Sequence, residues 1–229
     1  MASAPLDNPV WACLNGEHRR FSDGDGLARR YRRGFSPIAA LAGPGTGPLE
    51  ALAQLTEAGE TLATGFVSPG PIPSGWEVEA EASVLQMVST APIAARPADV
   101  EPVALGEGDA AAMMELTELT HPGPYGPRTH QLGAYLGIKA AGRLVAMAGE
   151  RMVLPGFREI SAVCTHPDWQ GRGCARLLIT RLADGIRREG RIPFLHVLAS
   201  NAAAIGLYER LGFRTRLASA MRVLRRVSD

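Results

Sequence analysis

Two glycines in a short polar stretch form the pattern in this sequence that is best suited to binding a ligand. Gly171 and Gly173 lie in the run from Gln170 to Arg176, Gln-Gly-Arg-Gly-Cys-Ala-Arg. Glycine lets the backbone approach a phosphate because no Cβ stands in the way. The apolar residues that follow recur at helical spacing, so we expect the glycines to precede a helix N-terminus. Free amides at such an end bind anions, and Arg172 and Arg176 add positive charge.

The elements around this turn must bring the chain to it and away from it. Glu159 begins a short run rich in β-forming residues, which predicts a strand that Pro167 ends. Residues 193–199 predict a second, buried strand after the helix. Ser200 or Asn201 is a good N-cap for a further helix, and Gly212 is well placed to end it.

The rest of the chain gives a coarser pattern. The N-terminal half predicts a helix over 49–62 and a strand over 76–88. The C-terminal half predicts, in order, a strand over 100–105, a helix over 109–119, a hairpin around Ala141-Gly142, the strand, helix, strand and helix described above, and a last hairpin over 213–224.

Two motifs in the C-terminal half resemble those of the GNAT superfamily of N-acetyltransferases. Gln170-Gly171-Arg172-Gly173-Cys174-Ala175 is similar to its acetyl-CoA motif, Q/R-x-x-G-x-G/A. The segment from Asn201 to Phe213 resembles its second motif, N-x-x-A-x-x-x-Y-x-x-x-G-F. The resemblance covers about 98–229. It implies an α/β (α+β) fold with a mixed, mainly antiparallel central sheet flanked by helices.

The same resemblance implies where acetyl-CoA (coenzyme A) binds and which group protonates its thiolate. The cofactor-binding residues would be Val163, Cys164 and Thr165 along the pantetheine arm, Gln170, Gly171, Arg172, Gly173, Cys174, Ala175 and Arg176 at the pyrophosphate, and Asn201 on the next helix. Tyr208 matches the tyrosine whose hydroxyl faces the sulfur in the family, which makes it a candidate catalytic acid. Packing of Tyr208 on the core is the alternative.

Glu159 is the candidate catalytic base. It lies eleven residues before Gln170, an offset at which the histone-acetylating branch of the family carries its carboxylate base. Burial would have to raise its pKa, because an ordinary glutamate is a weak base. An ion pair with Arg158 or Arg151 is an equally good interpretation.

Other proton acceptors and nucleophiles are weaker candidates. The histidines at 121, 130, 166 and 196 could each accept a proton near neutral pH. His121 and His130 bracket a loop rich in proline and glycine that could border an acceptor site. Cys164 is a weaker candidate nucleophile still, because the family transfers acetyl directly to the amine and no partnered histidine is marked. Cys174 fills a small position against the sheet and is interpreted as a packing residue. No set of residues has the spacing of a metal site.

The N-terminal half is separated from the motif-bearing half by a connector at 92–98. We therefore expect an N-terminal α/β region over 1–92 and an N-acetyltransferase domain over 93–229. A resemblance to the glycine N-acyltransferase-like branch implies that the N-terminal region is a degenerate copy of the same fold. The apolar surface of the N-terminal region could be buried against the C-terminal domain or against a second copy of the chain, so a homodimer is also compatible with the sequence.

Composition narrows the class of partner. The net charge of +1 gives no electrostatic case for nucleic acid or an anionic membrane surface. No apolar run reaches the ~18 residues of a membrane span. The first residues lack the features of a signal peptide, and three scattered cysteines suit a reducing compartment, so we expect a cytoplasmic protein.

Together these observations predict an acetyl-CoA-dependent N-acetyltransferase that acts on a primary amine of a small molecule, peptide or protein. A non-catalytic acyl-CoA-binding or sensing module is the alternative. A P-loop nucleotide site is disfavoured because the glycine turn lacks the Lys-Ser/Thr pair.

Overall fold

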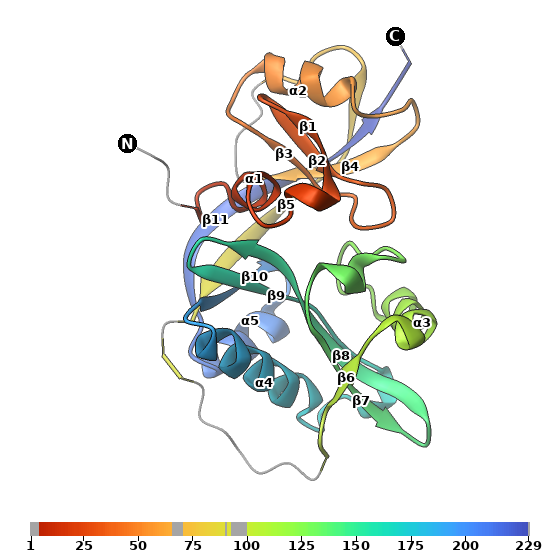
Figure 1. Ribbon diagram of the computed structural model, residues 1–229, viewed down its shortest axis with the longest axis vertical. Coiled ribbons are helices and arrows are strands. Elements are labelled where there is room, and N and C mark those ends of the chain that lie inside the picture. The colour runs from red at the N-terminus through yellow and green to blue at the C-terminus, as the bar shows by residue number, and fades with distance from the viewer. Residues whose placement is uncertain (1–4, 66–70, 90, 93–99, 229) are drawn as a thin grey trace.

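The computed structural model describes residues 5–65, 71–89, 91–92 and 100–228 (Figure 1). Most of the connector predicted at 92–98 lies outside these residues. Within them, no helix is long and apolar enough to cross a membrane. The strands form an eight-stranded sheet in the order β4-β11-β5-β10-β9-β8-β7-β6 and a three-stranded sheet in the order β1-β2-β3.

The helices and strands have the following bounds. The helices are α1 (Pro9–Asn15), α2 (Thr46–Ala53), α3 (Ala110–Thr120), α4 (Cys174–Arg188) and α5 (Ala202–Arg210). The first strands are β1 (Ser22–Asp25), β2 (Ala28–Tyr31), β3 (Ala39–Leu41), β4 (Thr61–Gly65) and β5 (Trp76–Val88). The others are β6 (Val103–Leu105), β7 (Tyr135–Ala140), β8 (Arg143–Leu154), β9 (Phe157–Thr165), β10 (Ile192–Leu198) and β11 (Arg214–Arg226).

Helices cover the large sheet on both faces. Ala146 and Ala148 of β8 belong to the apolar cluster formed with α4 and α5, while Met147 between them packs with α3. Because successive side chains of a strand point to opposite faces, α3 lies across the sheet from α4 and α5. The mixed, mainly antiparallel sheet flanked by helices is therefore confirmed, and β9–β10 is its parallel pair.

Two predicted elements of the sequence are wrong. The predicted hairpin over 213–224 is one continuous strand, β11, which pairs with β5 from Arg214↔Val88 to Arg226↔Trp76. The helix predicted over 49–62 ends at Ala53, and the chain then turns into strand β4. Both errors arise from pairing between distant segments. Strand β11 pairs with β5 on one side and with β4 on the other, so it stays extended and the residues before β5 form β4 instead of continuing the helix.

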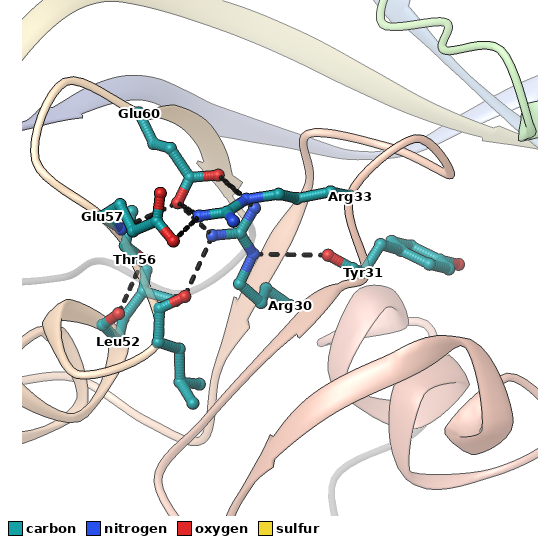
Figure 2. Close-up of polar contacts among 8 residues, drawn as sticks. Arg30, Tyr31, Arg33, Leu52, Thr56, Glu57 and Glu60 are labelled. Carbon is teal, nitrogen blue, oxygen red and sulfur yellow. Dashed lines mark hydrogen bonds and ion pairs between the residues drawn. The ribbon is translucent and has the colours of Figure 1, made fainter.

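The three-stranded sheet and α2 pack at one end of the large sheet, where β4, β5 and β11 extend past the other strands (Figure 1). Arg30 of β2 donates two hydrogen bonds to the Glu60 carboxylate, at 2.8 and 3.0 Å, and one to the Leu55 carbonyl (Figure 2). Arg33 donates two more to Glu60. Since Arg30 is buried, this cluster fixes the small sheet against the turn before β4.

The division into 1–92 and 93–229 stays a prediction. Strand β5 lies before residue 92, yet it pairs with β10 and with β11, both of which lie after it. Residues from the two predicted regions therefore share one sheet.

The large sheet opens between β9 and β10. These parallel strands pair only where Ile192–Phe194 meets Phe157–Glu159, although β9 continues to Thr165 and β10 to Leu198. Ala162, in the part of β9 that does not pair with β10, has φ 51, in the left-handed region that non-glycine residues rarely adopt. Such strained backbone often occurs at functional sites.

Candidate active site

A cavity of about 410 Å³ fills the opening between β9 and β10. Residues 160–165 of β9 and 196–198 of β10 line it, together with Asn201, Ala204 and Tyr208 around α5. Thr120 and the loop 121–124 after α3 line it as well. The cavity therefore passes through the sheet, with the α5 residues on one side and the α3 loop on the other.

The glycine turn leads to the N-terminus of α4, as predicted. Gly171 and Gly173 have φ values of 75 and 79, which favour glycine. Helix α4 begins at Cys174, and no side chain caps it. Gln170 through Gly173 are exposed, so the amides of the first turn can accept an anion.

Arg172 extends beside this turn. Its guanidinium lies 4.5 Å from the centroid of the Trp169 ring and donates to the Asp168 carbonyl. A stacked guanidinium stays charged, so Arg172 adds positive potential next to the free amides.

Tyr208 lies on α5 with its ring against Phe213 and lines the cavity. It is 8% exposed, and burial raises the pKa of its phenol to about 12. The hydroxyl is therefore protonated at neutral pH and can donate a hydrogen bond into the cavity. Asn201, which also lines the cavity, accepts a hydrogen bond from the Ala204 amide and so caps α5.

Glu159 is fully buried. Its carboxylate accepts two hydrogen bonds from Arg151, both at 2.8 Å, and lies 2.7 Å from Nδ1 of His196. Burial would raise its pKa, but Arg151 and then His196 outweigh it and lower the pKa to about 2. The base role of Glu159 stays a prediction, and this geometry weighs against it because so acidic a group is a poor proton acceptor. Arg158, the other suggested partner, pairs with Glu150 and Glu189.

The Arg151–Glu159 pair is part of a longer set of side-chain contacts, the buried polar chain. Nε2 of Gln86 lies 3.2 Å from Nε2 of His196, and Oε1 of Gln86 accepts from Arg216. The chain thus runs from β11 through β5, β10 and β9 to β8, one side chain from each adjacent strand. An amide nitrogen only donates, so Nε2 of His196 accepts from Gln86 and its Nδ1–H donates to Glu159. Both ring nitrogens of His196 are therefore occupied.

The remaining histidines are placed differently from one another. His121 lines the cavity at its α3 end, and its ring makes no hydrogen bond within the part of the chain that the structure describes. His130 lies 2.8 Å from Glu107. His166 accepts a weak hydrogen bond from the Asp168 amide in the turn after β9.

The cysteines are not activated. Burial raises the pKa of the Cys164 thiol to about 11, and burial also raises the pKa of Cys174. A thiol that stays protonated is a poor nucleophile. Among the described residues, no group of three or more His, Cys, Asp or Glu side chains could hold a metal ion.

The structure thus places most of the predicted site residues at one opening. Val163, Cys164, Thr165, Gln170, Asn201 and Tyr208 line the cavity. Residues 171–173 form the exposed turn, and residues 174–176 begin α4, with Cys174 buried. Gln86 and Arg216 of the buried polar chain could not be predicted, because no local motif marks them. Nor does any motif show that residues before 66 line the cavity.

Comparison with known proteins agrees with this geometry. Residues 135–223 match the family described as FR47-like protein. A [ribosomal protein bS18]-alanine N-acetyltransferase of Salmonella typhimurium is 36% identical over 115 residues, which cover 48% of this chain and 77% of that one. The N-alpha-acetyltransferase RimI of Mycobacterium tuberculosis is 32% identical over 131 residues, 51% of this chain and 82% of that one.

Solved structures extend the likeness to the whole chain. A crystal structure described as an acetyltransferase from the GNAT family, from Novosphingobium aromaticivorans, is 38% identical with a TM-score of 0.90 and covers 99% of this chain and 100% of its own. A GCN5-related N-acetyltransferase from Kribbella flavida, 16% identical with a TM-score of 0.64, covers 96% of this chain and 95% of its own and shares the fold. The chain therefore belongs to the GNAT family of N-acetyltransferases.

Proposed function

We propose that this N-acetyltransferase takes its acetyl group from acetyl-CoA and transfers it directly to a primary amine in a ternary complex. The observation that carries the proposal is the opening between β9 and β10, lined on its α5 side by Tyr208 and continued by the exposed turn at Gly171–Gly173. A long, thin donor with an anionic end fits such a path.

The turn before α4 and the end of β9 that does not pair with β10 would each hold one part of the donor. The first amides of α4 and the side chain of Arg172 would bind the diphosphate. Along the edge that does not pair with β10, the backbone of Val163, Cys164 and Thr165 would pair with the pantetheine amides as a neighbouring strand does. An amide of the same segment would polarise the acetyl carbonyl, as in an oxyanion hole.

Tyr208 would act on the departing sulfur. When the amine nitrogen forms its bond to the carbonyl carbon, the C–S bond breaks and a thiolate leaves. The Tyr208 hydroxyl, protonated at neutral pH, would donate a hydrogen bond to that thiolate and supply its proton.

The amine proton needs an acceptor on the other side of the cavity. Glu159 is tied to Arg151, and His196 has both ring nitrogens occupied. His121 lines the cavity, its ring makes no hydrogen bond to the residues that the structure describes, and an imidazole can serve as a general base. We therefore assign this role to His121.

The acceptor would be an α-amine. Relatives of the chain are named for N-alpha-acetylation and for acetylation of an alanine of ribosomal protein bS18. An α-amine has an ordinary pKa of about 8, against about 10.4 for a lysine side chain, and is more readily deprotonated.

Thiol release tests the proposal. Purified protein with acetyl-CoA and a peptide or amino-acid amide should release free thiol in proportion to acetylated amine, and acetyl-CoA should raise its Tm. A protein that acetyl-CoA does not stabilise and that releases no thiol with any amine contradicts the proposal. Stabilisation without thiol release would indicate the acyl-CoA-sensing alternative.

A further inference from the structure

The cavity extends beyond the opening into the N-terminal part of the chain. Five apolar side chains form its far wall, which we call the apolar wall: Val10 of α1, Ile38, Ala63 of β4, Met152 of β8 and Met221 of β11. They belong to one apolar cluster, with Met221 packed against it. The first three lie outside the 135–223 segment that matches the family.

The apolar wall is built by pairing between elements that are distant in sequence. Ile38 forms a parallel bridge with Ala63, whose amide donates to the Pro37 carbonyl at 2.7 Å. Three residues before Ala63, Glu60 accepts hydrogen bonds from Arg30 of β2, and these contacts fix the three-stranded sheet against β4 (Figure 2). The wall is therefore held in place before any ligand binds, which lowers the cost of ordering it.

The charge of the cavity restricts what can lie against this wall. Among the described residues that line the cavity, none is an aspartate or a glutamate. Arg151 is the fixed charge, and its guanidinium is already paired with Glu159. A second positive charge on the acceptor would lose its water there without gaining a counter-ion.

We infer that the apolar wall binds an uncharged, apolar side group next to the reacting amine, so that the N-terminal residues determine acceptor specificity. This inference rests on the proposed function, because it places the donor on the α5 side and leaves the wall to the acceptor. Thr64 and Ser161 also line the cavity and offer hydrogen-bond partners that a polar acceptor backbone can use but an acyl chain cannot.

A series of amino-acid amides measures this preference, since their α-amines are alike and their side chains differ. We expect kcat/KM to rise about fourfold for each added methylene from glycinamide through alaninamide to valinamide. Leucinamide should exceed argininamide by at least about tenfold, because the guanidinium has no partner in the cavity.

Variants of the wall locate the preference. Ala63→Leu should lower kcat/KM for leucinamide about tenfold, and by a larger factor than for glycinamide, because the added side chain occupies the space beside the wall. Met221→Ala, at a half-buried position, should lower the leucinamide value by a similar factor through lost contact. Met114→Ala is the matched control, since Met114 is half-buried on α3 and does not line the cavity.

Acetyl-CoA stabilisation of each variant separates the inference from the proposed function. If kcat/KM is the same for all the amino-acid amides while acetyl-CoA still stabilises the protein, the apolar wall is not an acceptor site. The same conclusion follows from a donor series in which propionyl-CoA and butyryl-CoA, not the larger amides, respond to Met221→Ala. Loss of both stabilisation and thiol release overturns the proposed function instead.

Discussion

Replacing Glu159 by glutamine tests whether this residue is a structural ion-pair partner or a base. The carboxylate is 0% exposed and accepts both hydrogen bonds from Arg151. Glu159→Gln keeps the shape of the side chain and one acceptor oxygen, but it leaves the buried Arg151 guanidinium without its counter-ion. Breaking a buried pair in this way costs about 3–5 kcal/mol. A protein of this size loses ~2–4 °C per kcal/mol, so the Tm should fall by about 10 °C.

The pH dependence of stability gives an independent measure of the same interaction. The folded pKa of Glu159 is lowered to about 2 from the ordinary value of 4.5. A lowered folded pKa stabilises the protein fully above pH 4.5, and this stabilisation is lost as the pH falls towards 2. At ~1.4 kcal/mol per pKa unit, the carboxylate contributes about 3 kcal/mol to the free energy of unfolding. Glu159→Gln should therefore abolish this part of the fall in stability at acidic pH.

Chemical denaturation between pH 3 and pH 8 measures both effects. The double variant Arg151→Met/Glu159→Gln is the control, because it removes the orphaned charge and should recover most of the lost stability. An unchanged free energy of unfolding in Glu159→Gln, together with loss of a kinetic pKa from kcat/KM, would refute this reasoning. That result would restore Glu159 as the catalytic base.

Three further changes address the donor and acceptor sites. Tyr208→Phe should lower kcat about 10²-fold or more with little change in acetyl-CoA affinity, and an unchanged kcat would exclude the acid role. Gly173→Val should weaken acetyl-CoA binding about tenfold, because a branched side chain disfavours the left-handed backbone at φ 79; calorimetry checks this against Gly43→Val, where a side chain meets nothing within 4 Å. His121→Ala should lower kcat/KM at least about 10²-fold, and added imidazole should restore part of it if the ring takes the amine proton.

The fold of the C-terminal half could be predicted because its signals are local. The glycine turn, the N-cap at Asn201 and the β7–β8 hairpin each depend on residues adjacent in sequence, and each occurs as expected. Tyr208 and the β9 residues come together because strand and helix periodicity put them on faces that the family fold brings into contact.

The rest depends on pairing between distant segments. Strand β11 continues through the predicted hairpin because it pairs with β5 on one side and with β4 on the other. Likewise, the partner of Glu159 is decided by register: β8–β9 pairing places Arg151, and not the sequence neighbour Arg158, against it. No short-range pattern could have linked Gln86 and Arg216 to this site.

The central claim is that the opening between β9 and β10, with the turn before α4, holds acetyl-CoA. Hydrogen–deuterium exchange with and without acetyl-CoA tests it directly. We expect slower exchange at the amides of residues 163–165 and 171–176, with little change in the Arg30–Glu60 cluster. Protection confined to the N-terminal region, or no protection at the turn, would contradict it.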